Sequence, residues 1–257
     1  MTTNTGDGRV AIVTGGGTGV WAATVRWLVD RGWRVAVNYS RSRDEAEAVA
    51  RACGGDAQAF AMQADVAVDA DCVRLAAATV ERYGRLDALV NNAGRTQFVP
   101  MHDLDAVSAD DFHRIYGVNT VGAFQMARAA ARHMGEGSAI VNVSSISTVT
   151  GQGSSMPYVV SKGGLNALTV TLARALAPRV RVNAVLPGFI DSRWLRDGYG
   201  DAVYEKAKAG YIDRVALARV CSPEAVADAI GWLIEGASLS TGQLLQVDAG
   251  MVLGRSR

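Results

Sequence analysis

The sequence predicts an α/β protein with one doubly wound, seven-stranded parallel sheet. Seven short apolar runs alternate with stretches of helical pattern, as in chains that return to a parallel sheet through a helix after each strand. The runs are almost continuously apolar, which is typical of strands buried on both faces. The glycine-rich and polar motifs follow the ends of these runs, which is where such sheets bind ligands.

The whole chain, 1–257, is interpreted as a single domain, because α/β folds of this length often form one unit. Its net charge is +1 and its basic residues are scattered, so neither nucleic acid nor a membrane surface is an expected partner, and a small molecule is. The polar start, 1–8, lacks an apolar signal core and is expected to be a disordered tail. The three cysteines are far apart and the three histidines lack metal-ligand spacing, so we predict a reducing cytoplasm and no metal site.

The first predicted strand is 9–14, RVAIVT, and the segment GGGTG follows it directly. A strand, a glycine loop and a helix in succession suit a phosphate group, because glycine permits the tight turn and the free N–H groups of the helix start attract an anion. Alone, the glycines are also compatible with an ordinary turn. A second strand at 34–39, RVAVNY, favours a dinucleotide site.

The remaining elements continue the alternation of helix and strand. They are a helix over 40–53, a strand over 57–66, a helix over 69–83, a strand over 86–90 that NNAG ends, a helix over 111–134, a strand over 139–143, a helix over 158–177, a strand over 180–185, a helix from Pro223 with Ser222 as its N-cap, and a strand over 243–247. Segment 189–220 interrupts this pattern with five aromatic residues among charges. It is interpreted either as a substrate lid or as a surface insertion whose aromatics fill the core.

Tyr158 and Lys162 are four apart in a predicted helix, so their side chains share one face. A free tyrosine has a pKa of about 10 and is a poor base near neutrality, but a fixed neighbouring cation favours the phenolate. Ser145 follows an apolar run and is expected to present its hydroxyl, from a strand end, to the same substrate oxygen. Together the three residues predict acid–base chemistry at that oxygen.

A second Tyr-x-x-x-Lys pair serves as an internal control. Tyr204 and Lys208 repeat the spacing, but the residue thirteen positions earlier is Asp191 instead of a serine. The surrounding YEKAK is polar, and we expect this pair to be solvated. The serine is therefore what distinguishes the first pair from the second.

With these motifs in place, residues 8–250 resemble the short-chain dehydrogenase/reductase family. TGGGTG is similar to its glycine motif, NNAG to its sheet-stabilising turn, PGFIDS to its nicotinamide-side loop and TGQLLQVDAG to its last strand. The resemblance implies a Rossmann fold, an NAD(H) or NADP(H) cofactor, and a homotetramer or homodimer built on the long helices. The cofactor-binding residues that it implies are Gly15, Thr18, Gly19, Val20, Asp65, Val66, Asn92, Ala93, Gly94, Tyr158, Lys162, Pro187, Gly188, Ile190 and Ser192.

By the same resemblance the catalytic set is Asn119, Ser145, Tyr158 and Lys162. Hydride passes between the nicotinamide and a carbonyl carbon, Tyr158 exchanges the proton, Ser145 stabilises the oxygen, Lys162 lowers the phenol pKa, and Asn119 fixes a relay water. An alternative for Asn119 is a polar side chain that bonds its own helix backbone. The substrate is expected to be a small ketone or secondary alcohol, and Arg95, Thr96, Phe98, Phe189 and 151–155 are expected to line its pocket.

Trp21 departs from the family pattern, since it occupies the place of the last glycine of the motif. It shares a stripe with Val25 and Leu28 and should face the sheet, where its indole is either packed around or intrudes on the dinucleotide cleft. This leaves two alternatives open. One is a related enzyme that lost its dinucleotide and performs elimination or dehalogenation, and the other is a binding protein without catalysis.

The end of the second predicted strand indicates a preference for NADP(H) over NAD(H). An NAD enzyme places an acid there on the ribose 2′-hydroxyl, whereas this chain has Asn38 and Tyr39, followed by Ser40 and Arg41. No carboxylate is present to repel a 2′-phosphate, and Arg41 can bind one in a forked geometry. The alternative is that Arg41 is a solvated residue at a helix start.

Overall fold

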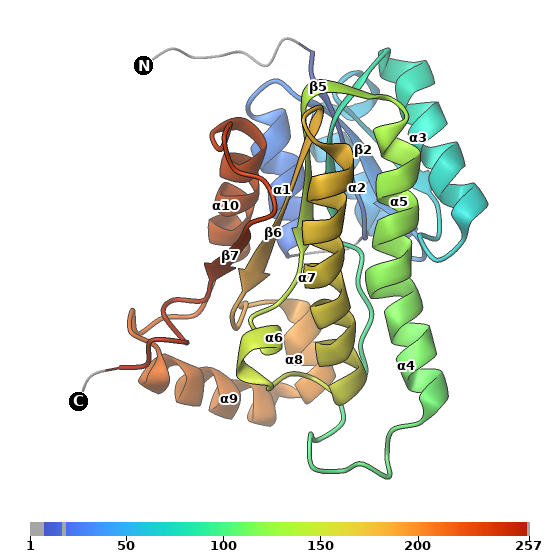
Figure 1. Cartoon of the computed structure of the whole chain (residues 1–257). Helices are drawn as coiled ribbons and strands as arrows, with labels where there is room; N and C mark the ends of the chain where they lie inside the picture. Colours follow the sequence, from blue (N-terminus) through green and yellow to red (C-terminus); the bar gives the residue numbers. More distant parts are fainter. Residues whose placement is uncertain (1–7, 17–18, 256–257) are drawn as a thin grey trace.

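The computed structural model describes residues 8–16 and 19–255 (Figure 1). They contain one sheet of seven parallel strands in the order β3-β2-β1-β4-β5-β6-β7. The predicted doubly wound sheet is therefore confirmed. Of the expected tail, 1–8, only Gly8 is described. The strands are β1 Val10–Val13, β2 Arg34–Tyr39, β3 Ala59–Gln63, β4 Leu86–Asn91, β5 Met134–Val143, β6 Val180–Pro187 and β7 Leu244–Val247.

Helices cover both faces of the sheet, because each strand alternates its side chains between two apolar layers. In β1, Ala11 and Val13 belong to one core cluster, whereas Val10 and Ile12 belong to the other. The first layer is packed by α1 Val20–Val29, α2 Arg43–Ala52 and α10 Pro223–Glu235. The second is packed by α3 Asp69–Tyr83, α5 Ala123–Ala131 and α7 Met156–Leu176. Ser222 caps α10 as predicted, since its hydroxyl accepts a hydrogen bond from Ala225 N.

The predicted helix 111–134 is present but is neither regular nor as long as expected. It starts earlier, at α4 Ala109–Tyr116, because Ser108 and Asp111 form a capping box. A π-helical turn, η2 Gly117–Gly122, then separates α4 from α5. The expected C-terminal end was wrong, because Met134 is buried and already pairs with Leu86 as the first residue of β5.

Segment 189–220 folds into two helices, α8 Arg193–Tyr199 and α9 Asp201–Arg214, which lie beyond the carboxyl ends of β6 and β7 (Figure 1). Tyr204 and Tyr211 are buried against Phe189, so part of the segment fills the core, as one of the two interpretations held. Trp194 is instead 46% exposed. Two short helical turns, η1 Gly55–Ala57 and α6 Ser147–Thr150, complete the elements of the described chain. Within 8–16 and 19–255, no helix combines the length and apolarity that crossing a membrane requires.

Candidate active site

A cavity of about 620 Å³ opens at the carboxyl ends of the strands, beside the point where the strand order reverses between β1 and β4. Open α/β sheets bind ligands at this point, because the loops after the two strands diverge to opposite faces. The predicted residues that line the cavity come from the glycine loop and the start of α1, from the loops after β4, β5 and β6, and from helix α7. The predicted catalytic and cofactor residues among them are Gly15, Gly19, Val20, Asn92, Gly94, Ser145, Tyr158, Lys162, Pro187, Gly188, Ile190 and Ser192. Of the predicted substrate-pocket residues, Phe189 and 152–154 line the cavity, whereas Arg95, Thr96, Phe98, Gly151 and Ser155 do not.

The glycine loop forms a cradle that other residues would fill. Gly15 has φ +94°, and a Cβ there would lie 2.7 Å from the Cα of Ala93. A Cβ on Gly16 would lie 2.4 Å from that of Tyr39. Gly19, with φ +69°, begins α1, whose free N–H groups face an anion at such a position. The cradle and the size of the cavity fit a dinucleotide, whereas Thr18 falls outside the described residues.

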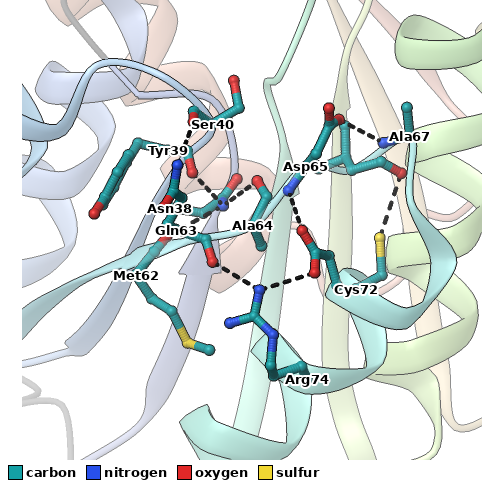
Figure 2. Close-up of polar contacts among 12 residues, drawn as sticks. Asn38, Tyr39, Ser40, Met62, Gln63, Ala64, Asp65, Ala67, Cys72 and Arg74 are labelled. Atoms are coloured by element: carbon teal, nitrogen blue, oxygen red, sulfur yellow. Dashed lines mark hydrogen bonds and ion pairs between the residues drawn. The ribbon is translucent and has the colours of Figure 1, made fainter.

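Asn38 holds the glycine loop in place through hydrogen bonds, a role that the sequence did not predict. It is 1% exposed, and its Oδ1 accepts a hydrogen bond from Gly15 N at 3.3 Å. Its Nδ2 donates to Ala64 O at 3.0 Å and to Met62 O at 3.3 Å, so the residue joins the glycine loop to β3 (Figure 2). The only signal in the sequence was an amide side chain inside an otherwise apolar buried strand.

Five of the predicted cofactor residues do not line the cavity: Ser40, Arg41, Asp65, Val66 and Ala93. Asp65 is exposed and its Oδ1 accepts a hydrogen bond from Ala67 N at 2.9 Å, which shapes the turn after β3 (Figure 2). Val66 is buried. Arg41 is exposed, and its side chain has no hydrogen bond or ion pair with the described residues. It is therefore available to an anion at the end of β2.

The NNAG turn ties three strands together, as the predicted sheet-stabilising turn should. The Thr14 hydroxyl accepts hydrogen bonds from the N–H groups of Asn92 and Ala93, each at 3.1 Å, which joins β1 to the end of β4. Asn91 Nδ2 donates to Asn142 Oδ1 in β5 at 2.9 Å. These bonds fix the edge of the cavity on which Gly94 lies.

The structure brings Tyr158, Lys162 and Ser145 together at one end of the cavity. Tyr158 and Lys162 share a face of α7, with the lysine Nζ 5.8 Å from the centre of the phenol ring. Lys162 is 4% exposed and donates to Val143 O at 2.7 Å. Ser145 is the second residue after β5, so the prediction that it lies at a strand end is confirmed.

The pKa values of both members of this pair are shifted by burial. Burial raises the pKa of Tyr158 to about 12, although hydrogen bonding with Ser145 acts in the opposite direction. Burial also lowers the pKa of Lys162 to about 8. That Lys162 lowers the phenol pKa therefore stays a prediction, because desolvation is the dominant cause here and the lysine Nζ is directed to Val143 O. The phenol therefore keeps its proton, which is the form that can protonate a substrate oxygen.

Asn119 lies in the π-helical turn η2 and is 1% exposed. Its Oδ1 accepts from Arg95 N at 2.7 Å, and its Nδ2 donates to Arg95 O at 3.0 Å and to Ser161 Oγ at 2.8 Å. The alternative that it bonds its own helix is wrong, because these bonds reach the loop after β4 and helix α7. Asn119 thus connects two walls of the site without lining the cavity itself.

The second tyrosine–lysine pair is also structured, so the expectation that it is solvated was wrong. Tyr204 is fully buried and donates a hydrogen bond to Asp191, and Lys208 Nζ contacts the same carboxylate at 2.5 Å. Burial, followed by the hydrogen bond with Asp191, raises the pKa of Tyr204 to about 12. Tyr204 does not line the cavity, so the pair joins α9 to the loop after β6 and lies apart from the candidate site.

Trp21 is packed into the core and also borders the cavity. It is 1% exposed, and its Nε1 donates to Val13 O at 3.3 Å, where the ladder of β1 ends. The prediction that it faces the sheet is confirmed, because it belongs to the cluster that includes Val25 and Leu28. Trp21 is also one of the residues that line the cavity.

Comparisons with known proteins identify relatives of this chain. Residues 16–252 match the family model described as enoyl-(acyl carrier protein) reductase. A solved structure from Burkholderia xenovorans, assigned as a short-chain dehydrogenase/reductase, superposes with a TM-score of 0.87 at 35% identity, covering 96% of this chain and 99% of the other. The chain belongs to the short-chain dehydrogenase/reductase family. The predicted oxidoreductase that transfers hydride between a nicotinamide cofactor and a carbonyl or alcohol group is thereby confirmed in class.

Two curated members of the short-chain dehydrogenase/reductase family are similar over nearly the whole chain. A protein from Streptomyces violaceoruber, assigned as ketoacyl reductase 2 of the granaticin polyketide synthase, is 41% identical and is matched over 97% of this chain and 98% of its own. A 3-oxoacyl-(acyl-carrier-protein) reductase from Staphylococcus aureus is 36% identical over 95% and 98%. No comparison favours the non-redox or the binding-protein alternative.

Proposed function

We propose that the protein is an NADP(H)-preferring carbonyl reductase that acts on small-molecule ketones. The observation that supports this proposal is the single cavity that joins the glycine cradle to Tyr158 and Ser145. Both curated relatives described above carry names of ketoacyl reductases, which favours ketone reduction over other hydride transfers.

In this proposal the bound cofactor supplies a hydride to the carbonyl carbon. Tyr158, whose phenol is protonated at neutral pH, donates its proton to the carbonyl oxygen as general acid. Ser145 donates a hydrogen bond to the same oxygen and stabilises its developing charge. Lys162 places a buried ammonium beside the phenol. We assign two roles to this ammonium: it binds the ribose hydroxyls of the cofactor, and it helps to return a proton to the phenol. Asn119 holds the Arg95 loop against α7, and we assign to it the positioning of a relay water.

The preference for NADP(H) rests on the end of β2. Asn38 is buried and fully used by backbone partners, so it is not the residue that meets the ribose. Ser40 and Arg41 follow, and the Arg41 guanidinium is free of described partners. We assign the 2′-phosphate to these two residues, the adenine to Asp65 and Val66, and the remaining contacts to the predicted set that lines the cavity.

Three further properties belong to the proposal. Segment 189–220 acts as a lid, since Trp194 and Tyr199 of α8 line the cavity. The protein forms a homotetramer or homodimer through its long helices, which expose apolar side chains at Tyr116, Val121, Phe124, Val160 and Val170. A cytoplasmic location suits the three free cysteines.

Oxidation of NADPH and of NADH with a panel of ketones tests the proposed function. We expect ketone-dependent NADPH oxidation, with a lower kcat/KM for NADH. A fluorescence titration with NADPH accompanies the assay. Binding of NADPH without turnover of any ketone would contradict the reductase, and an absence of binding would contradict the cofactor as well.

A further inference from the structure

Aromatic side chains form a wall at the carbonyl end of the cavity. Trp194 and Tyr199, both on α8, line the cavity together with Tyr158. The ring centres of Tyr158 and Trp194 are 6.4 Å apart, at an interplanar angle of 50°. Phe98, in the loop after β4, stands behind this wall, 5.9 Å from Trp194 and 4.7 Å from Tyr199, both in edge-to-face geometry.

This wall is held in place by close packing. A Cβ on Gly198 would lie 2.0 Å from Cε2 of Phe98, so the phenyl ring rests directly against the backbone of α8. Phe98 therefore supports the two cavity-lining rings from the outside, since it does not line the cavity itself. Trp194 nevertheless remains 46% exposed, unlike the buried Tyr204 and Tyr211 of the same segment. Trp194 is thus an anchored, partly exposed residue that lines the cavity beside the proton donor, and it offers apolar surface to a ligand.

We infer that the substrate is a ketone with a planar aromatic ring close to its carbonyl group, and this inference rests on the proposed function. A ketone whose oxygen accepts the proton of Tyr158 places its neighbouring carbons beside Trp194, because the two rings are adjacent. Aromatic pairs attract at centre separations of about 4.5–7 Å in offset or edge-to-face arrangements, beyond what their buried area contributes. A saturated ring fills the same volume without that contribution. The aromatic wall therefore selects flat aromatic ketones over saturated ones.

The test compares 2-tetralone with 2-decalone, which share a bicyclic skeleton and carry a carbonyl that is not conjugated to a ring. The measured quantity is the ratio of their kcat/KM values in the wild type, Trp194→Leu and Trp194→Phe. We expect the Leu variant to lower the ratio about 2- to 10-fold and the Phe variant to keep it within about twofold. Trp232→Leu is the matched control, because Trp232 is 51% exposed on α10 and does not line the cavity, so the ratio should stay as in the wild type. An unchanged ratio in Trp194→Leu would overturn the inference and leave the reductase intact.

A binding experiment decides the inference even if neither ketone is reduced. The full chain is titrated calorimetrically with 2-naphthol and with decahydro-2-naphthol, in the wild type and in Trp194→Leu. Tighter binding of 2-naphthol that is lost in the Leu variant supports the aromatic wall. Equal affinities for the two alcohols in the wild type, or a preference that survives in the variant, overturn it. Failure of turnover alone counts against the proposed function instead.

Discussion

Replacing Trp21 by glycine restores the residue of the family pattern, and the structure indicates that the protein should lose stability. Trp21 is 1% exposed and its Nε1 donates to Val13 O at 3.3 Å. Truncating a buried Trp costs about 3–5 kcal/mol, and glycine in a helix adds about 0.5–1 kcal/mol. The expected loss is thus about 4–6 kcal/mol, which corresponds to a fall in Tm of roughly 10–20 °C for a chain of this size.

Urea denaturation and thermal melting measure this loss, with Trp232→Gly as the matched control on the exposed face of α10. The control should lose less than half as much. A Trp21→Gly variant as stable as the wild type would refute the packing argument. Because Trp21 also lines the cavity, we expect the same variant to bind NADPH up to roughly tenfold more tightly, about 1.4 kcal/mol. Weaker binding would mean that Trp21 contacts the cofactor.

Three other variants test separate parts of the site. Arg41→Ala should weaken NADPH binding and leave NADH binding unchanged, because its free guanidinium is assigned to the 2′-phosphate; equal loss for both cofactors in titrations would contradict that assignment. Asp191→Asn should lower the free energy of unfolding by about 1 kcal/mol, because Asp191 accepts a hydrogen bond from Tyr204 and pairs with Lys208. The loss is small because the carboxylate is partly solvated, and an unchanged urea midpoint would contradict this link. The pKa of Lys162 in the folded chain, about 8, lies below its value in the unfolded chain. Between pH 8 and 10 the unfolded chain therefore binds more protons than the folded one, so the free energy of unfolding of the wild type, relative to that of Lys162→Met, should rise with pH. The rise should be about 1 kcal/mol per pH unit in denaturation at each pH, and a flat difference would contradict the burial of the ammonium.

The elements of the sheet were predictable because short apolar runs bounded by glycines, prolines or polar residues indicate buried strands whatever lies around them. Strand β2 and helix α3 have the bounds that the sequence predicts. The gathering of Ser145, Tyr158 and Lys162 was also predictable, since helical spacing and a strand end fix their directions.

Features that depend on contacts between distant segments were not predictable. Tyr204 is predicted to be solvated because YEKAK is polar, but Phe189 packs against its ring and Asp191, from the loop after β6, accepts a hydrogen bond from its hydroxyl. The sequence predicts only that Asn38 lies in a strand, and its hydrogen bonds to Gly15 and Ala64 depend on the folded arrangement of three segments. The raised pKa of Tyr158 likewise follows from desolvation by the assembled cavity, which the spacing to Lys162 does not reveal.

The most direct test of the proposed mechanism is the rate of ketone-dependent NADPH oxidation by Tyr158→Phe, measured together with its NADPH affinity. The substitution removes the transferable proton and little else, and general acid–base groups contribute about 10²- to 10⁴-fold. The account predicts a loss of turnover of that size with NADPH affinity within about threefold of the wild type, or about 0.7 kcal/mol. Turnover near that of the wild type in the Phe variant would contradict the assignment of Tyr158 as the proton donor.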